Sequence, residues 1–146
     1  MVVWDPPIRD YQFLYHELLP AIETVQRLGY TDFNADFLDS LIEGWATHCE
    51  EVWLPINQLG DREGLKFEDG KITMPQEFKD AYRKGIDEGW LSTTCELEHG
   101  GMGVPLFFQA VTWAEFGTSA CMALSVLPAL SIGVYEVLVK HGRQDL

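Results

Sequence analysis

A stretch of twenty residues without a charged side chain, from Phe116 to Tyr135, constrains the fold of this chain more than any other feature. Its length is about that of a helix that crosses a bilayer. However, Pro128 lies in its middle, it contains three serines, and Glu136 follows it directly. The mean hydropathy of the whole chain is also near zero, at −0.06. We therefore expect no membrane partner, and we expect this stretch to form buried helices in a larger soluble protein.

The charge of the chain excludes a second class of partner. Its 10 Lys and Arg residues against 23 Asp and Glu residues give a net charge of −13. Nucleic-acid backbones and anionic membrane surfaces would repel such a chain. The three cysteines lie far apart, and the N-terminus lacks the pattern of a signal peptide. These two features predict a cytoplasmic protein without a disulfide framework.

Apolar residues recur at helical spacing in two long segments, and no convincing series of strands is present. The first segment runs from Tyr11 to Leu28, where Pro20 should split the helix and Gly29 should end it. The second runs from Leu38 to Ile56, and Pro55 should finish it. The sequence therefore predicts an all-α fold.

The middle of the chain is expected to be less regular. Residues 57–70 are rich in Gly, Asp and Asn and predict a loop, with a possible short hairpin near residues 66–73. Thr73 to Gln76 predicts a capping box with an early proline at the start of a helix that Gly89 stops.

Two final helices are predicted after a glycine-rich break. Pro105 should start a helix that is apolar nearly all round and includes Ala110 and Val111. The last helix should run from about Ser119 to Lys140 and bend at Pro128. A helix that is apolar on every face needs cover on every face, which predicts a partner.

One helical segment carries a pair of possible metal ligands. His48 and Glu51 are three residues apart, close enough to share a metal ion. A single helix offers no third and fourth ligand, so no metal site is expected. The favoured interpretation is a solvated acidic face with Cys49 packed inward.

A second group of polar residues precedes the glycine cluster. Glu96, Glu98 and His99 could form an acid/base site. The following Gly100 to Gly103 lacks the Lys-Ser/Thr of a phosphate-binding loop, and no strand comes before it. A structural turn between two helices is favoured over a phosphate cradle.

An ordered succession of short motifs covers the chain from residue 6 to its end. The motifs are Pro6 to Asp10; Phe13 to Leu19; Leu54 to Asn57 with Gly60, Asp61 and Gly64; Gly70, Thr73, Pro75, Phe78, Lys79, Ala81 and Tyr82; Gly89 and Trp90; Glu98, Gly100, Gly101, Gly103 and Pro105; and His141, Gly142 and Gln144. In this order they resemble the N-terminal helical domain of long-form acyl-CoA dehydrogenases, a subgroup that includes the 3-methylmercaptopropionyl-CoA dehydrogenases.

The resemblance implies a flavoenzyme that oxidises the Cα–Cβ bond of an acyl-CoA thioester. In this family a glutamate removes the α-proton, hydride passes from Cβ to FAD, and the electrons leave to an electron-transfer flavoprotein. The β-domain and C-terminal helical bundle of relatives, which hold the glutamate and most FAD contacts, have no counterpart in this sequence. We therefore expect no catalytic residue in this chain, and we expect FAD in the full-length enzyme but not on this chain alone.

The resemblance also implies a domain division and a set of substrate-binding residues. Residues 1–34 would be an N-terminal helical extension, and residues 35–146 the dehydrogenase-type domain, truncated before the β-domain. In relatives this domain supplies part of the acyl pocket. Alignment assigns that face to Met122, Ser125, Val126 and Leu130, although packing in the chain's own core would also explain an apolar stripe.

Two functions follow from these observations. The first is the N-terminal domain of an acyl-CoA dehydrogenase, covered by the missing domains or by a second subunit. The alternative is a stand-alone helical interaction module derived from such a domain, without catalysis, that docks its apolar C-terminal face onto a partner.

Overall fold

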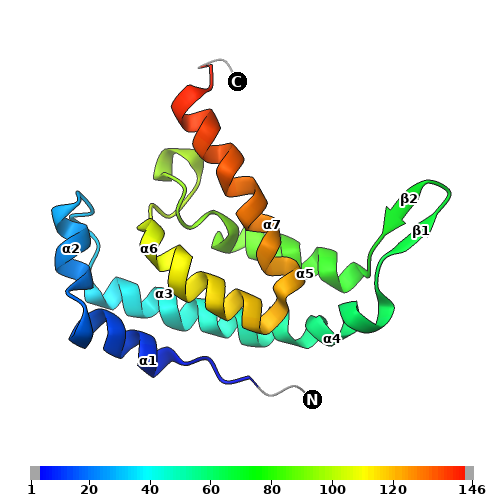
Figure 1. Cartoon of the computed structure of the whole chain (residues 1–146), viewed down its shortest axis with the longest axis horizontal. Helices are drawn as coiled ribbons and strands as arrows, with labels where there is room; N and C mark the ends of the chain where they lie inside the picture. Colours follow the sequence, from blue (N-terminus) through cyan, green and yellow to red (C-terminus); the bar gives the residue numbers. More distant parts are fainter. Residues whose placement is uncertain (1–3, 144–146) are drawn as a thin grey trace.

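The computed structural model describes residues 4–143, except for the side chains of Ala110 and Val111. Three of the predictions therefore fall outside the described residues. They concern Gln144, the apolar contacts of Ala110 and Val111, and the outer ends of the two predicted domain ranges. Within them the protein is helical, apart from one hairpin of two short strands (Figure 1). The predicted all-α fold and the predicted hairpin are both confirmed.

The elements follow one another along the chain with short connections. The N-terminal half contains α1 (Ile8–Gln12), a π-helix (Phe13–Leu18), α2 (Ala21–Arg27), α3 (Ala35–His48), a second π-helix (Cys49–Trp53) and α4 (Leu54–Glu63). The C-terminal half contains β1 (Lys66–Glu68), β2 (Lys71–Thr73), α5 (Gln76–Asp87), 3₁₀ turns at Trp90–Ser92 and Leu97–His99, α6 (Leu106–Phe108), a third π-helix (Gln109–Trp113) and α7 (Ala114–His141). β1 and β2 pair antiparallel, with Phe67 opposite Ile72.

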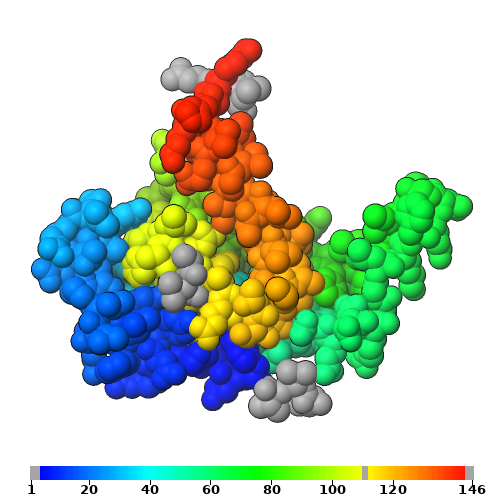
Figure 2. Space-filling model, in the orientation of Figure 1, coloured from blue at the N-terminus to red at the C-terminus, as the bar shows by residue number. Residues whose placement is uncertain are grey.

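The long segment formed by α3 and α4 is the base of the molecule, as Figure 1 shows. α6 and the first part of α7 run along this base, and α1 packs against the same two segments, with Tyr11 edge-on to Phe116. The hairpin and the C-terminal part of α7 both project from the body in the space-filling view (Figure 2). Both projections carry exposed apolar side chains.

The core is centred on the indole of Trp45, which is completely buried. Trp45 stacks on Trp113 with ring centroids 3.7 Å apart, and Trp53 meets it edge-on at 4.9 Å. Its Nε1 donates a hydrogen bond of 3.2 Å to the backbone oxygen of Trp113. The stacking joins α3 to the segment before α7, and it explains why the apolar period of the second segment faces inward.

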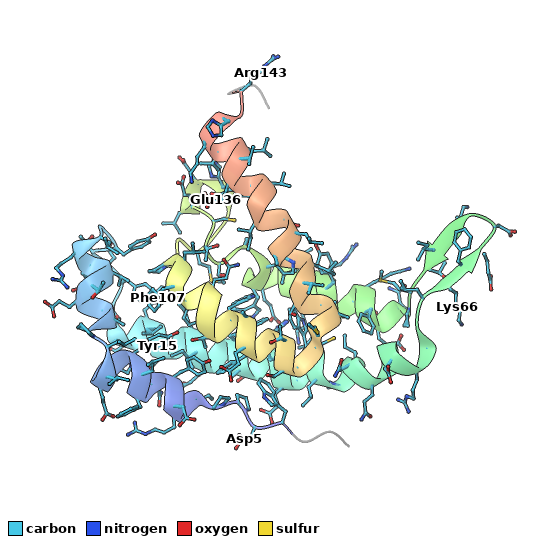
Figure 3. The ribbon with its side chains drawn as sticks, viewed as in Figure 1. Asp5, Tyr15, Lys66, Phe107, Glu136 and Arg143 are labelled. Atoms are coloured by element: carbon cyan, nitrogen blue, oxygen red, sulfur yellow. The ribbon has the colours of Figure 1, made fainter. Side chains whose placement is uncertain are left out.

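The N-terminal segment is joined to this core by two tyrosines. Tyr15 is 3% exposed; its hydroxyl lies 2.7 Å from Thr112 Oγ1, and its ring meets Phe107 edge-on (Figure 3). Tyr11 donates a hydrogen bond to Glu115 at the start of α7. Burial raises the pKa of Tyr15, so this hydroxyl stays protonated and remains available for the hydrogen bond. The division of the chain at residue 34 stays a prediction.

Pro20 splits the first helical segment as predicted, but Pro55 does not end the second. The chain passes through the π-helix Cys49–Trp53 and continues as α4 to Glu63, with Pro55 in its first turn. The backbone of Trp53 is helical, with φ −88° and ψ −42°, so the chain stays helical through the junction and accommodates the missing N–H of the proline next to the π-helix. The predicted loop over residues 57–70 is therefore wrong in its first half.

Two further expectations concern helix ends. Thr73 belongs to β2, and α5 starts after Pro75 without a side-chain cap, so the predicted capping box does not form. The backbone of α7 leaves the helical region at Cys121, with φ −156° and ψ 94°, so its last helix begins close to the predicted start near Ser119, but the bend lies at Cys121. Pro128 lies inside the helix beyond this break. The corner of the chain is therefore at Cys121 (Figure 1).

Candidate functional site

The C-terminal part of α7, after the break at Cys121, carries the four residues that alignment assigned to an acyl pocket. Met122, Val126 and Leu130 are 64%, 44% and 73% exposed, so the alternative of core packing does not describe them. Their spacing of four residues places them on one side of the helix. Ser125 is half-buried and faces inward, because a Cβ on Gly117 would lie 3.3 Å from its own Cβ.

The exposed side of α7 extends further than the sequence analysis assigned. We call the following residues the α7 ridge: Met122, Val126, Leu130, Val134, Val137 and Leu138, all of them more than 40% exposed. Val134 and Leu138 continue the same four-residue period, and Val137 follows Val134 by three residues; this helical spacing is the sequence signal that would have revealed them. This side of the stretch is exposed in the described chain, so the predicted cover would have to come from a partner.

The opposite side of α7 is attached to the body. Leu124 and Pro128 are buried on that side. Further along, the hydroxyl of Tyr135 accepts a hydrogen bond of 3.0 Å from the backbone N–H of Glu96 and lies 3.0 Å from His99 Nδ1. These contacts hold the ridge in a fixed orientation above the loop that contains the glycine cluster.

That loop brings together the three residues predicted as a possible acid/base site. One ligand atom from each of Glu96, Glu98 and His99 lies within 4.8 Å of the others. All three side chains are exposed, and the His99 ring is already in contact with Tyr135. Water therefore reaches each group, and the cluster offers no enclosed space in which a proton could be passed to a substrate.

The glycine cluster is a close-packed turn, as the favoured interpretation predicted. A Cβ on Gly101 would lie only 2.0 Å from the backbone oxygen of Cys95. Gly101 N–H donates to Glu96 O, and Gly103 N–H donates to Cys95 O. The space that a phosphate would need above Gly101 is filled by the chain's own backbone.

His48, the other predicted ligand candidate, is buried in the core. Its Nδ1 lies 2.6 Å from Glu88 Oε2, and Trp90 Nε1 donates 3.1 Å to the same oxygen. Its ring stacks on Trp45, whereas Glu51 is exposed. Glu50 and Glu51 are exposed and Cys49 is buried, as expected of a solvated acidic face, but His48 does not belong to that face. Glu88 thus joins α3 to the end of α5.

The burial of His48 predicts a pH dependence of stability. Burial lowers the pKa of His48 below its ordinary value of 6.5, more than the contact with Glu88 raises it. Its Nε2 is buried without a hydrogen-bond partner among the described residues, so a second proton there would be unpaired. The unfolded chain therefore binds more protons than the folded one below about pH 6.5. The free energy of unfolding is expected to have its full value above that pH and to decrease as the pH is lowered below it.

Urea denaturation between about pH 5 and about pH 8 measures this effect. A His48→Gln variant, in which the amide can still donate to Glu88, is the control and should lose the step near pH 6.5. If the free energy of unfolding decreased equally in both proteins, the decrease would come from the titration of another group.

The described fold is that of a helical domain, and the order of its motifs resembles that of the acyl-CoA dehydrogenases. The comparison with known proteins confirms this resemblance: the chain is 32% identical to 3-methylmercaptopropionyl-CoA dehydrogenase of Ruegeria pomeroyi over 143 residues. The match covers 97% of this chain and 24% of the relative, so the chain spans about a quarter of that protein's length. No protein-family model matches the chain.

Proposed function

We propose that this chain is the N-terminal helical domain of an FAD-dependent acyl-CoA dehydrogenase, in which the α7 ridge forms part of the wall against which the acyl chain lies. The exposure of the ridge carries this proposal. A helix that only filled a core would not expose Met122, Val126 and Leu130 to this degree. The identity to a dehydrogenase over nearly the whole chain supports it.

The role of the domain would be to position the substrate rather than to react with it. Apolar contact along the ridge would hold the acyl chain and so fix its Cα and Cβ atoms relative to the reacting groups. FAD would supply hydride acceptance in the full-length enzyme, held mainly by its other parts. An electron-transfer flavoprotein would accept the electrons.

The catalytic base also belongs to another part of the enzyme in this proposal. Glu136 on α7 is exposed and lies 3.1 Å from Lys140 Nζ, so it stays with its own ion pair. Glu96 and Glu98 are exposed on the loop below. None of these three carboxylates is enclosed with the ridge.

We propose the cytoplasm as the location of the protein, in keeping with its three free cysteines.

The first experiment is the mass of the native product in its source cells. A product several-fold heavier than 16.6 kDa is expected, and that whole protein should reduce an electron-accepting dye with an acyl-CoA substrate. The 146-residue chain alone should not reduce the dye and should retain no FAD after gel filtration. The proposal would be refuted if the isolated chain reduced the dye, or if the heavier native product did not reduce it.

The contribution of the ridge is tested in the active protein by Leu130→Asp. A charge on this wall should lower kcat/KM for acyl-CoA by about tenfold or more, mainly through KM, because the acyl chain loses apolar contact. Leu28→Asp is the matched control, since Leu28 is also 73% exposed but lies on α2. Equal effects of the two variants on kcat/KM would show that the ridge does not contact substrate.

A stand-alone interaction module is the second candidate, and the exposure of the ridge also favours it. Monomers rarely expose a continuous apolar surface without a partner for it. A native product of 16.6 kDa would support this function, because the first proposal places the base and the flavin in other parts of a larger enzyme. The two candidates are therefore distinguished by the same measurement of mass.

The ridge is not proposed as a membrane anchor. α7 is long and apolar enough to cross a membrane by length and composition, the one such helix among residues 4–143. The break at Cys121 leaves fourteen consecutive uncharged residues, 122–135, in the helix that follows it. A helical segment of this length is about 21 Å long, which is less than the thickness of a bilayer's hydrocarbon core, about 30 Å. Solubility without detergent is expected, and a requirement for detergent would contradict it.

A further inference from the structure

The hairpin of β1 and β2 projects from the body where α4 meets α5 (Figures 1 and 2). All six of its strand residues are exposed. Its base is held firmly, because the ring of Phe78 on α5 packs directly over Gly60 on α4, where a Cβ would lie 2.4 Å from the ring. The hairpin is therefore presented to solvent in a defined orientation.

The side chains of the hairpin are divided between an apolar and a polar face. Successive residues of a strand point to opposite faces, and Phe67 pairs with Ile72. Leu65 and Met74 follow the same alternation, one step beyond each strand. These four side chains are 67%, 72%, 67% and 43% exposed in the order Leu65, Phe67, Ile72 and Met74. We call them the hairpin's apolar face.

An uncovered face of this kind is unfavourable. A two-stranded hairpin alone is marginally stable in water, and it becomes stable when its apolar side packs against something. The body of the protein does not cover this face. The face is therefore open to the surface of a partner.

The distribution of charge indicates which partner can approach. Residues 62–84 contain six of the ten basic residues and five of the 23 acidic ones, a net charge of +1. The rest of the chain contains four basic and eighteen acidic residues, a net charge of −14. Two copies of the chain repel each other over most of their surface, but not through the segment that bears the hairpin.

We propose that the hairpin's apolar face is a self-association surface on which the hairpin of a second copy packs, related by a two-fold axis. A two-fold contact uses the same patch on both subunits, so the one nearly neutral segment meets itself. Phe67 and Ile72 of one copy cover those of the other. The α7 ridge remains free for the function proposed above, and the hairpin contact does not depend on that function.

Sedimentation equilibrium of the whole chain tests the proposal. The wild-type chain is expected to dimerise, and Phe67→Ser combined with Ile72→Ser should weaken the dimer by about tenfold or more. Leu130→Ser combined with Val134→Ser on the ridge is the matched control and should leave the dimer unchanged. Because both variants alter exposed side chains, circular dichroism should show an unaltered fold.

Two further readouts locate the contact. Raising NaCl from about 50 mM to about 500 mM should strengthen the wild-type dimer, because salt screens the repulsion between two acidic chains. Cross-linking of a mixture of ¹⁴N and ¹⁵N chains through lysine should join Lys66 or Lys71 of one copy to those of the other. A monomeric wild type, a hairpin variant that dimerises as tightly, or intermolecular cross-links confined to other lysines would overturn the proposal.

Discussion

Replacing Trp45 by alanine is expected to lower the free energy of unfolding by about 4 kcal/mol, the usual cost of removing a fully buried tryptophan. Trp45 is 0% exposed and contacts Trp53, Trp90, Trp113 and the ring of His48. Its removal leaves a cavity that four large rings cannot close together. The carbonyl of Trp113 also loses its donor.

The measurement is urea or thermal denaturation followed by circular dichroism. For a chain of this size, about 4 kcal/mol corresponds to a fall in Tm of roughly 12 °C. Since domains of this kind are stable by about 5–15 kcal/mol, the variant should be partly unfolded at the lower end of that range. Trp45→Phe should cost only about 1–2 kcal/mol, because it keeps a ring in the stack and loses the N–H bond.

Leu28→Ala is the control for this variant, because Leu28 is 73% exposed and its truncation should change stability by no more than about 0.5 kcal/mol. If Trp45→Ala cost no more than Leu28→Ala, the indole would not be the centre of the core. The assignment of α3 as the element around which the other helices pack would then be wrong.

The position of Trp45 could be predicted from sequence, because helical periodicity depends on local spacing. Leu38, Leu41, Ile42, Trp45 and Cys49 recur at that spacing, and all are buried. The hairpin was also predictable, because Asp69 and Gly70 both adopt the positive φ that its turn requires. Such features are determined by neighbours a few residues apart.

Features that depend on distant contacts could not be predicted in this way. His48 is buried because Glu88, forty residues away, accepts a hydrogen bond in the core. The continuation of the helix past Pro55 depends on a π-helix that a periodicity of 3.6 does not reveal. The corner at Cys121 is set by packing of two helix segments on the body, and no glycine or proline marks it.

The candidate site shows the same limit. The resemblance assigned Met122, Ser125, Val126 and Leu130 to one face; Met122, Val126 and Leu130 are exposed together on α7, whereas Ser125 is half-buried. Periodicity alone could not tell whether that face is covered, because an apolar stripe has the same pattern in a core and at a surface. The exposure of the ridge therefore came from the fold and not from the pattern.

The second large effect is expected for Gly101→Ala, which should cost about 3 kcal/mol because the new methyl group has no space. It would lie 2.0 Å from Cys95 O, 2.4 Å from Cys95 C and 2.6 Å from Cys95 Cβ. A backbone group cannot rotate away as the end of a flexible side chain can. The loop must therefore open, which breaks the hydrogen bonds from Gly101 N–H to Glu96 O and from Gly103 N–H to Cys95 O.

Gly100→Ala separates this steric cost from backbone strain. Gly100 has a φ of +78° but no atom within 4 Å of its added Cβ, so its cost is that of the left-handed conformation, about 1 kcal/mol. Thermal denaturation should rank the variants Gly101→Ala, then Gly100→Ala, then wild type in order of rising Tm. The reverse order would mean that the turn is held by its backbone angles and that the contact with Cys95 is loose. In that case the loop would have room for a ligand. The conclusion that its backbone fills the space that a phosphate would need would then also be wrong.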